Sequence, residues 1–151
     1  MAIEVFNRYE HKYLLDSDTY KSVIAEMDKN MELDAYNIGH KPYTIANIYY
    51  DTDDDYLIRN SLAKPEYKEK LRLRSYGVPE KDGLVYLEIK KKYRGLVNKR
   101  RTTFMLNEAY DFVKSGEQPQ KQSYMNGQVL DEITYFLHHY KLKPKLYLAY
   151  D

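Results

Sequence analysis

Basic side chains occupy every second position of one short run in this sequence: Lys68, Lys70, Arg72 and Arg74. Because successive side chains of a β-strand point to opposite faces, this spacing puts all four on one face of a strand. Phosphate chains need several fixed positive charges in a row, since one cation cannot offset the repulsion among neighbouring phosphoryl groups. The run therefore predicts a surface that binds a polyanion.

Two later runs extend this surface. In residues 84–93, three apolar residues alternate with a more polar set, which is Tyr86, Glu88, Lys90 and Lys92. Residues 96–106 alternate less cleanly, and we expect Lys99 and Arg101 to share the basic face. Short turns between the runs make the three strands antiparallel neighbours. Neighbouring strands lie about 4.8 Å apart and same-face residues about 6.6–6.8 Å apart, so a triphosphate could touch several bases together.

Charge is segregated along the chain. Residues 64–101 hold thirteen Lys or Arg and five Asp or Glu, whereas the whole chain has a net charge of only +1. Our candidates for catalysis form the centre of this region and are Arg72, Arg74 and Lys90. Arg8, Lys70 and Arg101 are further candidates for binding phosphate.

Two carboxylates interrupt the basic positions. Glu88 lies among the bases of the second run, and Glu10 lies between Arg8 and Lys12 in a strand that we expect over residues 3–15. Either carboxylate could bind a divalent metal that bridges phosphate oxygens, and oxygen ligands favour magnesium or manganese. Either could equally be an ion-pair partner that orients a neighbouring base. The sequence leaves both roles open.

The remaining elements form a frame around these strands. We expect further strands over 43–51 and 145–151, and helices over 17–31, 56–62, 107–114 and 123–140. Asp16 or Ser17 should cap the first of these helices and Asn107 the third. The apolar positions of the first helix share one stripe, which predicts that this stripe is buried.

Composition bounds the fold and the chemistry. At 151 residues, 43% of them hydrophobic, the chain suits a single α+β domain over residues 1–151, built on an antiparallel sheet with flanking helices. The chain has no cysteine, which excludes disulfides, thiolate zinc sites and cysteine nucleophiles. No apolar run reaches the roughly 20 residues that span a bilayer, so we expect a soluble, cytoplasmic protein.

Simpler interpretations compete with chemistry at several motifs. The basic face could be a solvated surface with cross-strand ion pairs. The acids in residues 51–55 could bind calcium, but they lack the glycine and distal glutamate of an EF-hand and fit a cap for the next turn better. His138 and His139 would point about 100° apart on a helix and make a poor metal pair. Tyr76 and Tyr86 could stack a nucleotide base.

Several motifs together resemble a known family. They are Arg8-Tyr9-Glu10-His11-Lys12-Tyr13, Asn47-Ile48-Tyr49-Tyr50-Asp51-Thr52, Lys70-Leu71-Arg72-Leu73-Arg74-Ser75-Tyr76-Gly77 and Leu87-Glu88-Ile89-Lys90. Their combination is similar to the VTC polyphosphate polymerase domain, a branch of the CYTH-like triphosphate tunnel metalloenzymes. Their order and spacing agree with that domain from residue 3 to residue 151.

The resemblance implies a fold, an activity and partners. It implies an antiparallel barrel, lined by Lys and Arg, in which the γ-phosphate of a nucleoside triphosphate is transferred to a growing polyphosphate chain. Manganese or a similar divalent metal would assist, without being needed for the fold. By this resemblance the phosphate path is lined by Lys12, Arg72, Arg74, Lys90 and Lys99.

The resemblance also implies an incomplete barrel. The family domain continues past the position of Asp151 with further strands and a closing helix. We therefore expect an unpaired strand edge at residues 145–151, which could pair with a second chain.

Three functions follow from the sequence. The leading one is phosphoryl transfer on polyphosphate or a triphosphate. The second is a non-catalytic module that binds polyphosphate or another polyanion. The third is binding of single-stranded nucleic acid, through phosphate contacts combined with tyrosine stacking.

Overall fold

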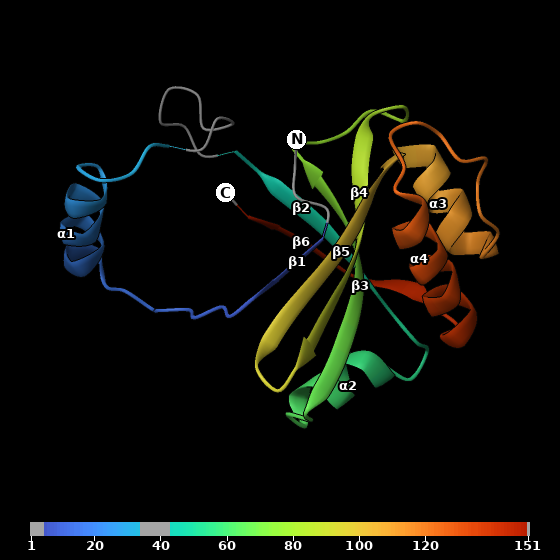
Figure 1. Ribbon diagram of the computed structural model, residues 1–151, viewed down its shortest axis with the longest axis horizontal. Coiled ribbons are helices and arrows are strands. Elements are labelled where there is room, and N and C mark those ends of the chain that lie inside the picture. Colours follow the sequence, from blue (N-terminus) through green and yellow to red (C-terminus); the bar gives the residue numbers. More distant parts are fainter. Residues whose placement is uncertain (1–4, 34–42, 151) are drawn as a thin grey trace. The chain divides into compact units, whose positions relative to one another are not determined.

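The computed structural model describes residues 5–33 and 43–150 (Figure 1). The chain forms two compact units, one made of residues 10–43 and the other of residues 1–9 and 44–151. No helix in the described ranges is long and apolar enough to cross a membrane.

The smaller unit contains one helix, α1 (Ser17–Met27). The side chain of Asp16 accepts a hydrogen bond of 2.8 Å from the backbone N–H of Thr19, so the predicted cap is confirmed. The helix ends four residues before the predicted residue 31, and none of its residues is buried. The smaller unit by itself therefore does not bury the predicted apolar stripe.

The larger unit is built on one six-stranded sheet in the order β1-β5-β4-β3-β2-β6, with every neighbouring pair antiparallel. The strands are β1 (Val5–Arg8), β2 (Ile45–Asp51), β3 (Tyr67–Tyr76), β4 (Leu84–Tyr93), β5 (Leu96–Met105) and β6 (Lys143–Tyr150). β1 and β6 lie at the two edges, so the sheet is open, as predicted. The first strand stops at Arg8 and not at residue 15, because residues 9–16 form no ladder.

A two-residue turn joins β4 to β5. Arg94 and Gly95 connect the strands directly, and both have positive φ angles, 46° and 90°. Positive φ at both central residues is the conformation that matches the twist of a tight antiparallel hairpin. The turn therefore fixes the register in which β4 and β5 pair.

Helices α3 (Leu106–Ser115) and α4 (Gly127–His139) cover one face of this sheet (Figure 1). The sheet contributes alternate apolar residues to the core, which are Leu71, Leu73, Val85, Leu87, Ile89 and Phe104. Facing residues of the helices are Ala109, Phe112, Val129, Leu130, Ile133 and Phe136. Full burial of each larger apolar side chain stabilises the fold by roughly 1.5–3 kcal/mol, so this face supplies most of the stability.

The starts of both helices differ from the prediction. α3 begins at Leu106, because the Glu108 carboxylate accepts a bond of 3.0 Å from the backbone N–H of Met105, and Asn107 is not its cap. α4 begins at Gly127 and not at residue 123. Asn126 caps it by accepting a bond from Val129 N–H at 3.1 Å, and residues before this cap lie outside the helix.

Helix α2 (Tyr56–Leu62) begins on a buried carboxylate, that of Asp51 at the end of β2. One oxygen of Asp51 accepts bonds of 2.8 Å from the N–H groups of Thr52 and Leu57, and the other accepts a bond of 2.9 Å from Ile58 N–H. The capping role predicted for this acidic stretch is therefore confirmed.

We expect Asp51→Ala to lower the free energy of unfolding by about 2 kcal/mol, at the upper end of the range for capping residues, because three backbone N–H groups, that of Leu57 buried, lose their acceptor. Urea denaturation would measure the loss. Asp54→Ala is the matched control, since the exposed Asp54 bonds only Thr52 and Arg59 side chains and should cost far less. Equal losses in both variants would contradict this account of α2.

Candidate functional site

The face of the sheet opposite α3 and α4 carries the predicted bases. Directly opposed residues of an antiparallel pair lie on the same face, and the register opposes Arg72, Glu88 and Arg101 in one row. The adjoining rows are Arg74 with Tyr86, then Lys70 with Lys90 and Lys99, then Lys68 with Lys92. We call these positions of β3, β4 and β5 the basic face.

The register confirms where the bases point, including Lys99 and Arg101, whose run alternated less cleanly in the sequence. Arg8 opposes Val97, which alternates onto the same face as Lys99. Glu10 and Lys12 belong to the smaller unit, where their charged groups lie 3.7 Å apart. The part that each residue plays in binding phosphate stays a prediction.

A buried carboxylate lies at the centre of the basic face. The Glu88 side chain has no exposed surface, and one of its oxygens accepts a bond of 2.6 Å from Arg72 Nε. Its other oxygen lies 3.6 Å from Lys99 Nζ and 3.7 Å from Arg101 Nη1, and it accepts no hydrogen bond. Three cations thus converge on one carboxylate, and their side chains cover it.

Electrostatics keep Glu88 ionised. Burial alone would raise the pKa of its carboxyl group, but the charges of Arg72, Lys99 and Arg74 outweigh burial and lower it below the ordinary value of 4.5. The pKa of the Lys99 ammonium is also lowered, because burial lowers it more than the charge of Glu88 raises it. The carboxylate thus allows several cations to share a surface that would otherwise repel them.

Neutral groups also hold the arginines. Arg72 Nη1 donates to the hydroxyl of Tyr49 at 3.3 Å. Arg74 donates from Nε to Asn47 Oδ1 at 3.0 Å and from Nη2 to the hydroxyl of Tyr150 at 3.2 Å.

The guanidinium of Arg101 lies over the ring of Tyr86, 4.6 Å from its centroid. Together with its position near Glu88, this contact restricts the third arginine of the basic face. The supporting residues on β2 are not evident from the sequence alone, although Asn47 and Tyr49 alternate in the run that precedes the basic strand. The contact of Tyr150 with Arg74 depends on the pairing of β6 with β2, which no local pattern reveals.

The lysine row differs from the arginine rows. Lys70, Lys90 and Lys99 oppose one another across three strands, and like charges in direct opposition destabilise a sheet. On β3, β4 and β5, all of which the structure describes, the basic face holds eight cations and one carboxylate, Glu88. An anion bound here would relieve this repulsion.

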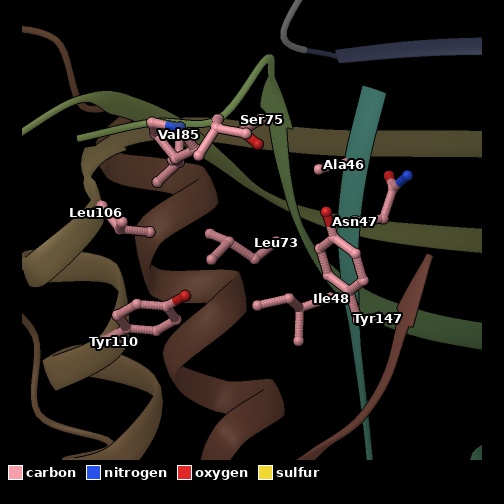
Figure 2. Close-up of a pocket in the computed structure, with 11 residues that line it drawn as sticks. Ala46, Asn47, Ile48, Leu73, Ser75, Val85, Leu106, Tyr110 and Tyr147 are labelled. Atoms are coloured by element: carbon pink, nitrogen blue, oxygen red, sulfur yellow. The ribbon is translucent and has the colours of Figure 1, made fainter. Parts of the chain in front are cut away.

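One cavity beside the sheet adjoins the basic face and another does not. Figure 2 shows a small cavity of about 120 Å³, where Leu73 and Ile48 lie near Leu106 and Tyr110 of α3. Its lining has no charged side chain, so it does not suit a phosphate. A larger cavity of about 390 Å³ lies beside Lys70 and Tyr49, with Leu146 among its apolar walls.

The described residues do not fit a divalent metal. In residues 5–33 and 43–150, no three His, Cys, Asp or Glu side chains lie close enough together to hold one. Both oxygens of Glu88 face Arg or Lys cations within 4 Å, which would repel a metal ion. Of the two roles that the sequence left open for Glu88, its surroundings favour ion pairing.

The similarities to known proteins extend over almost the whole chain. A family model described as the VTC domain matches residues 7–151. No curated protein matches the sequence.

Twelve chains of solved structures match. One is a Bacillus halodurans protein described as a candidate adenylate cyclase, with a TM-score of 0.51 and 17% sequence identity. The match covers 97% of this chain and 62% of the Bacillus halodurans chain. At this identity the similarity concerns the fold alone.

We expect Glu88→Gln to lower the free energy of unfolding by about 3 kcal/mol at neutral pH, because it leaves the partly buried cations Arg72, Lys99 and Arg101 without their counter-charge. The amide keeps the shape of the side chain, so the loss reports charge and not packing. Chemical denaturation of both proteins would measure it. A variant as stable as the wild type would refute the counter-charge role.

The stabilities of wild type and Glu88→Gln should also depend differently on pH. Folding lowers the pKa of Glu88 below 4.5, so its stabilising contribution is complete above that value and disappears as the pH falls through the lower pKa of the folded state. The difference in unfolding free energy between wild type and Glu88→Gln should therefore shrink as the pH is lowered from 5 to 3, roughly the range over which carboxylates titrate. A difference that stays constant over this range would contradict the assignment.

Proposed function

The chain belongs to the VTC domain family, and we propose from its basic face that it binds triphosphate and polyphosphate and takes part in phosphoryl transfer between them. The observation that carries this proposal is the set of opposed cations on β3, β4 and β5. A sheet tolerates such opposition at a cost, and a bound chain of phosphates offsets it with several charge-assisted hydrogen bonds.

The arginines suit the reacting phosphoryl groups. Arg72, Arg74 and Arg101 each have a contact that restricts their position, to Glu88, Asn47 or Tyr86. Fixed donors stabilise charge that develops during a reaction without first having to reorganise. In the proposed reaction, a terminal oxygen of polyphosphate attacks the γ-phosphorus of a nucleoside triphosphate, and the bond from that phosphorus to the bridging oxygen of the β-phosphate breaks. The products are polyphosphate longer by one phosphoryl group and a nucleoside diphosphate.

Lys90 has a different place in the proposal. It lies in the row next to Arg72, between Lys70 and Lys99, and an ammonium there can bind a phosphate oxygen as a point charge. The resemblance to tunnel metalloenzymes suggests a divalent cation as well. Because the described residues do not fit one, no step of the proposed reaction depends on it.

Binding without turnover is the main alternative. The sheet of this chain is open, and the chain spans 62% of the length of the solved relative. Catalysis by the whole family domain is therefore part of the proposal and not a property assigned to residues 1–151 alone.

Nucleic acid is a weaker candidate, for a specific reason. Tyr86 has one ring face under the guanidinium of Arg101, and its centroid lies 5.8 Å from that of Tyr76 in an edge-to-face arrangement. A base that stacked on Tyr86 would compete with these contacts. Stacking on the two tyrosines that the sequence suggested is thus disfavoured.

We expect this chain to bind tripolyphosphate in titration calorimetry, with an affinity that falls as salt is raised. A parallel assay for nucleoside diphosphate release from ATP and polyphosphate, with and without manganese, distinguishes the alternatives. Binding with release supports the transferase, and binding without release supports the binding module. Binding of an oligonucleotide but not of tripolyphosphate would refute both.

We expect Arg74→Ala to weaken tripolyphosphate binding about tenfold, which corresponds to about 1.4 kcal/mol, because one fixed guanidinium is lost. Arg74 is a sharper test than Arg72, since its hydrogen-bond partners Asn47 and Tyr150 are uncharged and Glu88 keeps its closest ion pair. Arg100→Ala is the matched control, because Arg100 lies on the opposite face near Glu132 of α4. Equal weakening by both variants would indicate loss of folding or of general charge, and not of a site.

A further inference from the structure

We propose that Lys68 and Lys92 extend the phosphate site by one row, so that the basic face binds long polyphosphate more tightly than tripolyphosphate. This inference rests on the proposed function and adds a subsite to it. The sequence places both residues on the polyanion-binding face, but neither is among the side chains named above as candidate phosphate ligands. The ligand class is a linear polyphosphate longer than the triphosphate that the arginines hold.

The position of the row follows from the register. Lys68 lies two residues before Lys70 on β3, and Lys92 lies two residues after Lys90 on β4, so both share the basic face. Same-face neighbours on a strand lie about 6.6–6.8 Å apart, and the next strand lies about 4.8 Å away. From Arg74 to Lys68 the face offers four consecutive basic rows, which extend over about 20 Å along the strands.

Lys68 and Lys92 form no ion pair within the described part of the chain. Lys92 is half-buried, and its side chain makes no hydrogen bond or ion pair within residues 5–33 and 43–150. Lys68 donates one bond of 3.2 Å to the carbonyl oxygen of Ser61, and an ammonium has two further N–H donors. The two lysines oppose each other directly, and the third position of the row, on β5, is the apolar Val97. A phosphate oxygen between the two lysines would relieve their repulsion.

The arginine rows and the Lys68–Lys92 row suit different parts of a bound phosphate chain. Arginines held by fixed partners keep phosphoryl groups in one geometry, which a reacting centre needs. A chain that grows by one phosphoryl group at each cycle must also shift along its site. Lysines are flexible point charges and can follow a moving chain of phosphates from one oxygen to the next. The Lys68–Lys92 row would therefore hold the part of the chain that does not react.

A purely structural role makes a different prediction. Lys68 also neutralises the carbonyl end of α2, because Ser61 lies in the last turn of that helix. If that were its whole role, Lys68→Ala would lower stability and would affect short and long phosphate chains equally. Lys92 has no such contact, so Lys92→Ala separates the two roles.

The test compares ligands of two lengths on the full chain. Calorimetry measures the affinities of tripolyphosphate and of a long-chain polyphosphate, at one ionic strength, for wild type, Lys92→Ala and Lys68→Ala/Lys92→Ala. We expect wild type to prefer the long chain and the double variant to reduce the ratio of the two affinities about tenfold. The single variant should reduce it less. The control is Lys81→Ala/Lys114→Ala, which removes two exposed lysines outside the basic face and should keep the wild-type ratio.

Each outcome bears on one proposal or on both. A ratio unchanged in Lys92→Ala and in the double variant overturns the subsite, even if tripolyphosphate binds as expected. An equal loss for both ligands also overturns it, because the lysines would then belong to the triphosphate site or to the fold. Failure of wild type to bind tripolyphosphate overturns the proposed function itself and this inference with it.

Discussion

The basic face depends on a single buried negative charge. Glu88 lies beneath Arg72, Lys99 and Arg101, and its ionised state is maintained by the same cations that it holds together. Without it, the middle row would contain two arginines beside a row of three lysines, with no carboxylate on the basic face of β3, β4 and β5. The counter-charge therefore makes a dense cationic surface compatible with a folded sheet, at the cost of one unit of the positive charge available to an anion.

The two faces of the sheet have separate tasks. Apolar residues such as Leu71 and Ile89 pack against α3 and α4 and are fully buried. The alternate side chains of the same strands point to the opposite face of the sheet, where repulsion among the bases opposes folding. Because side chains alternate strictly along a strand, the stability gained on one face offsets the repulsion on the other. A polyanion bound to the basic face would lessen that repulsion further.

Local patterns predicted the central strands well, because period-two alternation covers all of β3 and β4 and short turns set their neighbours. They predicted the direction of each base but not its support. The contacts of Arg74 to Asn47 and Tyr150 join strands that are distant in sequence, and only the sheet order reveals them. Errors at the end of the first strand and at the starts of α3 and α4 have a similar origin, since pairing and capping there depend on partners outside the local pattern.

The turn at Arg94 and Gly95 also determines which charged residues of β4 and β5 lie opposite each other. With only two residues, it aligns Arg101 opposite Glu88 and Lys99 opposite Lys90. A slip of one residue would exchange the faces of β5, so that Arg100 and Thr102 would replace Lys99 and Arg101 opposite the bases of β4. Arg101 would then lie against the hydrophobic core. The length of this turn thus determines on which face of the sheet the bases of β5 lie. A change in its length would move them, even though the turn itself is not part of the proposed phosphate site.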